Sequence, residues 1–272
     1  MIPCINQATV MPTDTLEFII QAREAGFRLI EFDITKLEEA VQKYGLAKIK
    51  ETINSRGLKV VSLNAIENYP ILTHDEMQSS LSRCERIFEL SKNLACEIVV
   101  VNPSEYAPST QEQTEAAFDS FIKELAPLSS RFSIKLGYEF VAYPNRIVNT
   151  LADSLRALSR WSSEGDLGLV VDIFHLFRTG EQLSQIPGEM MDRVWVFHVN
   201  DAPSLPLSTL KDSDRVFPGE GVIDLKKPVK ELERAGYAGP VSLELFNQAY
   251  WARPAAEVLR ESWKKLQRLL ES

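Results

Sequence analysis

The chain has 272 residues, of which 44% are hydrophobic and 25% are charged, and its formal net charge is −8. This composition is that of an ordinary globular protein, and the length suits one domain spanning residues 1–272. A negatively charged surface repels phosphate backbones and anionic lipid headgroups. We therefore expect no nucleic-acid partner and no membrane partner.

The three cysteines, Cys4, Cys84 and Cys96, form no CxxC pair. This spacing argues against a disulfide framework and against a structural zinc site. The N-terminus lacks a basic segment followed by an apolar one, and no apolar run reaches about 18 residues. These features predict a cytoplasmic protein.

Short apolar or β-branched runs alternate with longer stretches of helical periodicity, which predicts βα units around a parallel sheet. We expect strands at residues 4–7, 29–32, 60–63, 98–101, 135–139, 168–172, 194–198 and 241–245, and helices at 15–25, 81–93, 112–125 and 255–270, among others. Eight such units predict a single-domain α/β fold of the (β/α)8 TIM-barrel type. An open doubly wound sheet is disfavoured, because no GxGxxG follows the first strand.

Four residues with metal-binding side chains stand at the ends of the last four expected strands: Glu139, Asp172, His198 and Glu244. In a closed barrel these ends meet at one rim, where active sites of this fold lie. Three carboxylates sharing one space raise one another's pKa values unless a cation neutralises them. We therefore expect one divalent metal ion, with Mn²⁺ as the first choice and Co²⁺, Mg²⁺ or Zn²⁺ as alternatives.

Each of these four residues also has a simpler interpretation. A carboxylate after a strand often only caps the next helix, and a single histidine after an apolar strand is more often structural. The coincidence of all four on consecutive strands favours the metal site.

Two further residues are expected at the same rim. His175 follows Asp172 by three residues, and Arg215 lies in the longest irregular stretch, residues 201–221. Both are candidates for binding substrate oxygens, although Arg215 could instead form a loop ion pair with Asp212 or Asp214. Three aromatic residues beyond the last strand could stack on a substrate ring or merely pack against the barrel: Phe246, Tyr250 and Trp251.

At these residues the chain resembles the xylose isomerase-like barrel superfamily, and within it the inosose (2-keto-myo-inositol) isomerase branch. The matching passages are residues 6–9, 62–65, 139–141, 148–150, 168–172, 174–175, 214–216, 218–219 and 241–246. The resemblance implies that Glu139, Asp172, His198 and Glu244 bind the metal and that His175 and Arg215 contact substrate. One departure, residues 142–144 with the sequence Ala-Tyr-Pro, leaves room for a shifted substrate preference.

The expected reaction is isomerisation of a small polyhydroxylated ketone through an enediolate, with Glu139 and Glu244 as the proton carriers. A ketose 3-epimerase and a dehydroshikimate dehydratase-like lyase are the alternatives. An endonuclease IV-like enzyme is disfavoured because such a multi-metal site needs more than the three histidines present. A non-catalytic sugar or metal sensor is disfavoured because the chain offers candidate proton carriers. The sequence leaves a homo-oligomer open.

Overall fold

The strands form the centre of the molecule. In the computed structural model, which describes residues 1–67, 69, 71–161 and 163–271, eight parallel strands close into a barrel in sequence order. Each strand pairs with the next, and β1 closes the ring by pairing with β8. The strands are β1 (Ile2–Asn6), β2 (Leu29–Asp33), β3 (Lys59–Ile66), β4 (Ile98–Val101), β5 (Lys135–Tyr138), β6 (Leu167–Asp172), β7 (Val194–Val199) and β8 (Pro240–Leu243). The predicted TIM barrel is confirmed.

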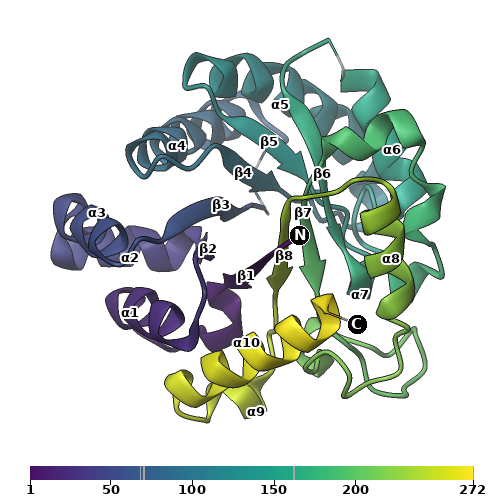
Figure 1. Ribbon diagram of the computed structural model, residues 1–272. Coiled ribbons are helices and arrows are strands. Elements are labelled where there is room, and N and C mark those ends of the chain that lie inside the picture. Colours follow the sequence, from purple (N-terminus) through teal and green to yellow (C-terminus); the bar gives the residue numbers. More distant parts are fainter. Residues whose placement is uncertain (68, 70, 162, 272) are drawn as a thin grey trace.

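Helices surround this barrel (Figure 1). They are α1 (Thr15–Ala25), α2 (Ile34–Tyr44), α3 (Leu46–Ser55), α4 (His74–Asn93), α5 (Gln111–Arg131), α6 (Leu151–Trp161), α7 (Ile173–Thr179), α8 (Lys226–Arg234), α9 (Gln248–Trp251) and α10 (Ala255–Leu270). Helices α1 and α10 have the predicted bounds and lie against each other. Helix α4 begins seven residues earlier than predicted (His74 instead of residue 81), because Thr73 and Glu76 form a capping box there.

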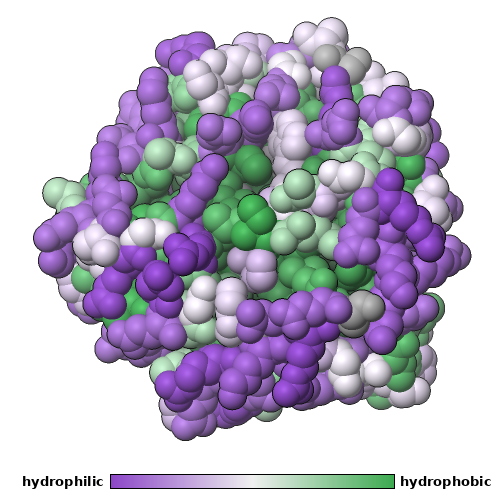
Figure 2. Space-filling model, viewed as in Figure 1, coloured by the Kyte–Doolittle hydropathy of each residue, from purple (hydrophilic) through white to green (hydrophobic). Residues whose placement is uncertain are grey.

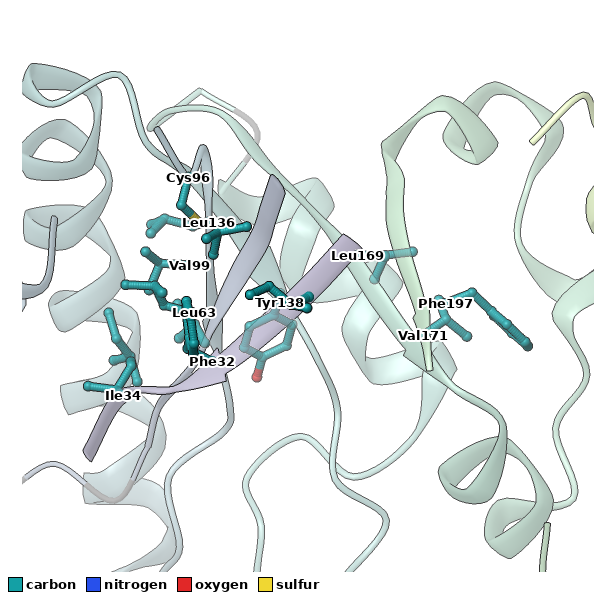
Figure 3. Packing of buried hydrophobic residues seen from close by; sticks show 14 of the residues in the cluster. Phe32, Ile34, Leu63, Cys96, Val99, Leu136, Tyr138, Leu169, Val171 and Phe197 are labelled. Atoms are coloured by element: carbon teal, nitrogen blue, oxygen red, sulfur yellow. The ribbon is translucent and has the colours of Figure 1, made fainter. Parts of the chain in front are cut away.

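Period-two alternation separates the two faces of each strand. On β6, Leu169 and Val171 point outward and pack beneath the helices, whereas Val170 belongs to a separate cluster inside the barrel. Figure 3 shows outward residues of this kind, among them Leu136, Leu169 and Phe197. Asp172 and His198 continue the inward series on β6 and β7, because they follow Val170 and Val196 by two residues.

Polar side chains dominate the outer surface over the helices, while apolar and neutral residues gather near the middle of the face shown in Figure 2. Among the described residues, no helix is long and apolar enough to cross a membrane. His74, expected at the surface, is exposed at the start of α4.

Candidate metal centre

The four predicted ligand residues meet at the carboxyl ends of β5 to β8. Glu139 and Glu244 directly follow β5 and β8, while Asp172 ends β6 and His198 lies near the end of β7. One ligand atom from each residue lies within 4.8 Å of the others, and all four residues are buried. Although β5 and β8 end one residue before Glu139 and Glu244, barrel geometry still brings these two side chains to the common rim.

His198 links the cluster to the opposite side of the barrel. Its Nδ1 lies 2.9 Å from Glu139 Oε1 and 3.6 Å from Glu244 Oε2. Its Nε2 lies 3.2 Å from Glu31 Oε2, on β2. Burial alone would lower the pKa of His198, but the charges of Glu244, Glu31 and Glu139 raise it well above its ordinary value.

Arg215 reaches into the cluster from the loop after β7. Its Nη1 donates to Asp172 Oδ2 and to Glu244 Oε2, each at 2.7 Å, and its side chain is 2% exposed. It also donates to Asp212 Oδ1, at 2.6 Å from Nη2. Arg215 thus lies at the expected rim and also forms the alternative ion pair with Asp212. The Phe174 and Phe246 rings lie 4.8 and 5.1 Å from its guanidinium carbon.

The carboxylates that share Arg215 differ in their pKa values. Burial and the neighbouring carboxylates Glu139 and Asp172 raise the pKa of Glu244, despite the opposing charges of His198 and Arg215. Burial acts in the same direction on Asp172, but Arg215 lowers its pKa, and Phe174 N donates to its Oδ1 at 2.7 Å. Of these two carboxyl groups, Glu244 therefore holds a proton more readily than Asp172.

His175 lies beside Arg215, as predicted for a residue at this rim. Its Nε2 is 3.4 Å from Arg215 Nη2, and its Nδ1 accepts a hydrogen bond of 3.4 Å from the Ala142 backbone. Burial lowers the pKa of His175. A neutral imidazole in this position can accept or donate a hydrogen bond to a substrate oxygen.

A small cavity opens above the cluster. Its volume is about 260 Å³, and its walls include Glu139, His175, Arg215, Glu244 and Phe246. Of the three aromatic candidates, Phe246 thus lines the cavity. The other two pack elsewhere: the Tyr250 ring lies 4.3 Å from that of Phe217, and Trp251 Nε1 donates to the Ala8 carbonyl at 2.8 Å.

Polar residues outside the predicted set hold the four side chains in place. Asn6 Nδ2 donates to Glu244 Oε1 at 2.8 Å, and Asn200 Nδ2 donates to Asp172 Oδ1 at 3.1 Å. Asn102 Nδ2 lies 3.4 Å from Glu139 Oε2, and Glu31 contacts His198. Sequence reasoning missed these roles. The available signal was that Asn6 and Glu31 occupy inward positions of their strands, two residues after Cys4 and Leu29.

The donor set suits a divalent cation. It offers three carboxylates and one imidazole nitrogen, and the outer oxygens of Asp172 and Glu244 receive amide hydrogen bonds from Asn200 and Asn6. Such outer hydrogen bonds orient ligating carboxylates in metal sites. A cation would also offset the mutual repulsion of the three carboxylates, which Arg215 and His198 neutralise only in part.

Comparison with known proteins agrees with this arrangement. The family described as "Xylose isomerase-like TIM barrel" matches residues 19–268. The inosose isomerase of Halalkalibacterium halodurans is 26% identical over 260 residues, which cover 94% of this chain and 92% of that protein. The 3-dehydroshikimate dehydratase of Pseudomonas aeruginosa is 28% identical over 246 residues, which cover 89% of this chain but 37% of that protein.

The crystal structure of the IolI protein with a zinc atom has a TM-score of 0.90 and 25% identity to this chain, and the match covers 100% of this chain and 98% of that one. Similarity to isomerases along the whole chain, together with the four-residue cluster, makes the protein a metal-dependent enzyme of the isomerase type. The chain belongs to the xylose isomerase-like TIM-barrel family.

Proposed function

We propose that the chain isomerises inosose (2-keto-myo-inositol), with Glu139, Asp172, His198 and Glu244 as ligands of one divalent metal ion. The observation that supports this most directly is the convergence of the four candidate ligand atoms within 4.8 Å of one another, with Glu139 and Glu244 lining a small cavity. Manganese remains our first choice of metal, and the zinc atom of the IolI structure makes zinc a strong alternative. The three buried, unpaired cysteines favour a cytoplasmic location.

The charges of the cavity favour an uncharged substrate. Five carboxylate residues line it: Asp33, Glu67, Glu139, Asp212 and Glu244. Two arginines also line it, and each is already ion-paired. Arg146 lies 2.9 Å from Glu105, and Arg215 contacts three carboxylates.

A phosphate or carboxylate group on the substrate would therefore enter a negatively charged space in which both arginines already have carboxylate partners. The divalent ion would be needed by the oxygen atoms of the reacting ketone, so a further anionic group would be desolvated without a cationic partner of its own, which is unfavourable. A neutral, hydroxyl-rich ketone can instead use the amide, carboxylate and imidazole groups of the walls as hydrogen-bond partners. This reasoning favours inosose over a sugar phosphate and over the carboxylated ring of a dehydroshikimate.

The reaction moves a proton between neighbouring carbon atoms. One glutamate, Glu139 or Glu244, removes the proton from the carbon that bears a hydroxyl group, which leaves an enediolate. A protonated glutamate then returns a proton to the former carbonyl carbon, while the proton of the original hydroxyl group passes to the former carbonyl oxygen, so that carbonyl and hydroxyl exchange places. His175 and Arg215 orient the substrate oxygens on which negative charge develops. When bound, the divalent metal supplies Lewis-acid stabilisation of that charge.

Proton nuclear magnetic resonance in deuterium oxide tests this function. Protein loaded with zinc, which is diamagnetic, should exchange the hydrogen next to the carbonyl of 2-keto-myo-inositol for deuterium and form an isomer. The same protein given 3-dehydroshikimate should produce no new ultraviolet absorbance from an aromatic product. The opposite pattern would replace the isomerase assignment with a dehydratase.

A pair of variants tests the proton carriers. Glu244→Gln should slow exchange by about 10²- to 10⁴-fold, the usual contribution of a positioned acid or base. Glu220→Gln is the matched control, because Glu220 lies outside the cavity and bonds Lys265 at 2.7 Å. Near-normal turnover by zinc-loaded Glu244→Gln protein would remove Glu244 from the proton transfer.

A further inference from the structure

The His198 ring lies between two groups of carboxylates on opposite sides. Its Nδ1 faces the other cluster members, at 2.9 Å from Glu139 and 3.6 Å from Glu244. Its Nε2 faces Glu31, which comes from β2 on the other half of the barrel and lies 3.2 Å away. Both side chains are fully buried, so water does not compete for these contacts.

Glu31 is itself held in a fixed orientation. Asn64 Nδ2 donates to its Oε2 at 3.0 Å, and Ser62 Oγ donates to the same oxygen. Asn64 also donates to Ser62 Oγ at 2.8 Å, so the three side chains form a connected network on β2 and β3. Two donors directed at one oxygen suit a carboxylate that only accepts hydrogen bonds.

We propose that Glu31 is a positioning residue of the metal centre, whose carboxylate accepts the Nε2 proton of His198 and thereby keeps the Nδ1 lone pair directed at the metal position. The inference rests on the proposed metal site. A neutral imidazole carries one ring proton, and the acceptor beside one nitrogen decides which nitrogen holds it. Without Glu31, a proton on Nε2 would lose its acceptor, whereas a proton on Nδ1 could still be donated to Glu139. The ring would then favour the Nδ1 proton, and a protonated Nδ1 cannot bind a metal ion.

Zinc affinity measured by titration calorimetry in competition with a chelator tests this role without an activity assay. Loss of such an outer partner usually weakens metal binding about 10- to 100-fold, and we expect this range for Glu31→Gln. Glu39→Gln is the control for the lost charge, because Glu39 is exposed on α2, lies outside the cavity and pairs with Lys36 at 3.2 Å. Its replacement should change zinc affinity by less than about 3-fold.

The tautomer of His198 provides the second measurement, and it needs no variant. The chain has only three histidines, so their ring nitrogen-15 resonances can be separated. Zinc-loaded wild-type protein should carry the His198 proton on Nε2. If Glu31→Gln does not fold, Ser62→Ala replaces it, and we expect weaker zinc binding from the less restrained Glu31.

The outcomes separate the two proposals. Tight zinc binding by the wild type together with unchanged affinity in Glu31→Gln, or with the His198 proton on Nδ1, would overturn the role of Glu31 and leave the metal site standing. Failure of the wild type to bind zinc would overturn both. A selective loss of affinity in Glu31→Gln, but not in Glu39→Gln, with the proton on Nε2, would support the role.

Discussion

Replacing Asp201 should loosen the loop that carries Arg215 over the cavity. The Asp201 side chain is 1% exposed, and its carboxylate accepts four backbone hydrogen bonds. Oδ1 accepts from Ala202 and Ile223, both at 2.9 Å, and Oδ2 accepts from Gly219 at 3.0 Å and Gly221 at 2.9 Å. One carboxylate thus holds the loop downstream of Arg215 against the end of β7.

The variant Asp201→Asn gives the sharpest prediction, because it keeps the shape of the side chain. The amide oxygen can still accept two of the four hydrogen bonds, but the amide nitrogen then faces the other two N–H groups as a donor. Hydrogen bonds to a charged group contribute about 1.5–3 kcal/mol each. Losing two costs about 3–6 kcal/mol, and water entering the loosened loop offsets part of this, so we expect about 3 kcal/mol.

Hydrogen exchange reports this local loss, because the loop can open without unfolding the barrel. The Gly219 and Gly221 amides should exchange roughly 100-fold faster in Asp201→Asn than in the wild type, as 1.4 kcal/mol corresponds to a factor of ten. Asp224→Asn is the control, since Asp224 is exposed in the same loop. Equal exchange at both amides in the Asp201→Asn variant and the wild type would refute the reasoning.

Three further predictions concern stability, each measured by chemical denaturation. Asp14 caps α1. Burial acts to raise the pKa of Asp14, but hydrogen bonds from Tyr44 and Lys43 outweigh it and lower this pKa. Asp14→Ala should therefore lower the free energy of unfolding by about 1 kcal/mol at pH 7. Because the pKa of Asp14 is lower in the folded than in the unfolded state, the stability difference between wild type and variant should shrink as pH falls below about 4. A constant difference down to pH 2 would contradict this. Gly168→Ala should destabilise by about 1–3 kcal/mol, because the new Cβ would lie 2.5 Å from the Arg193 carbonyl and 2.5 Å from the Trp195 ring; an unchanged midpoint would show that β6 and β7 can move apart. Tyr138→Phe should leave stability unchanged or raise it by about 1 kcal/mol, because the buried Tyr138 hydroxyl has no hydrogen-bond partner among the described residues; a clear loss would reveal a bound water there.

Local signals predicted much of the fold. Helix α1 begins where Asp14 caps it and ends before Gly26, whose φ of 122° is favourable for glycine. Strand positions followed from β-branched runs, and their ends were predicted to within one or two residues, except that β3 continues to Ile66, three residues beyond the predicted end. The two longest helices were underestimated: α5 continues to Arg131 although Pro127 lies inside it.

The site was predicted where it depends on the position of strand ends and missed where it depends on contacts between distant segments. Asp172 and His198 were singled out because each lies at or next to the end of an apolar strand. Glu31 has the same inward position on β2, but its partner His198 is 167 residues away, and nothing local distinguishes it from Asp33, which caps a helix. The ion pairs of Arg215 likewise depend on how the loop folds back, which side-chain periodicity does not describe.

These contacts assign different tasks to the two halves of the barrel. Strands β5 to β8 provide or precede the four candidate ligand side chains, whereas β1 and β2 provide Asn6 and Glu31, which contact two of them. Asn6 reaches Glu244 across the β1–β8 seam, where Cys4 pairs with Ser242. Glu244 and His198 therefore acquire these contacts only when the barrel closes. Metal binding is consequently expected to stabilise the closed barrel as a whole, because an ion that binds only the folded state shifts the equilibrium away from any form in which β1 has separated from β8.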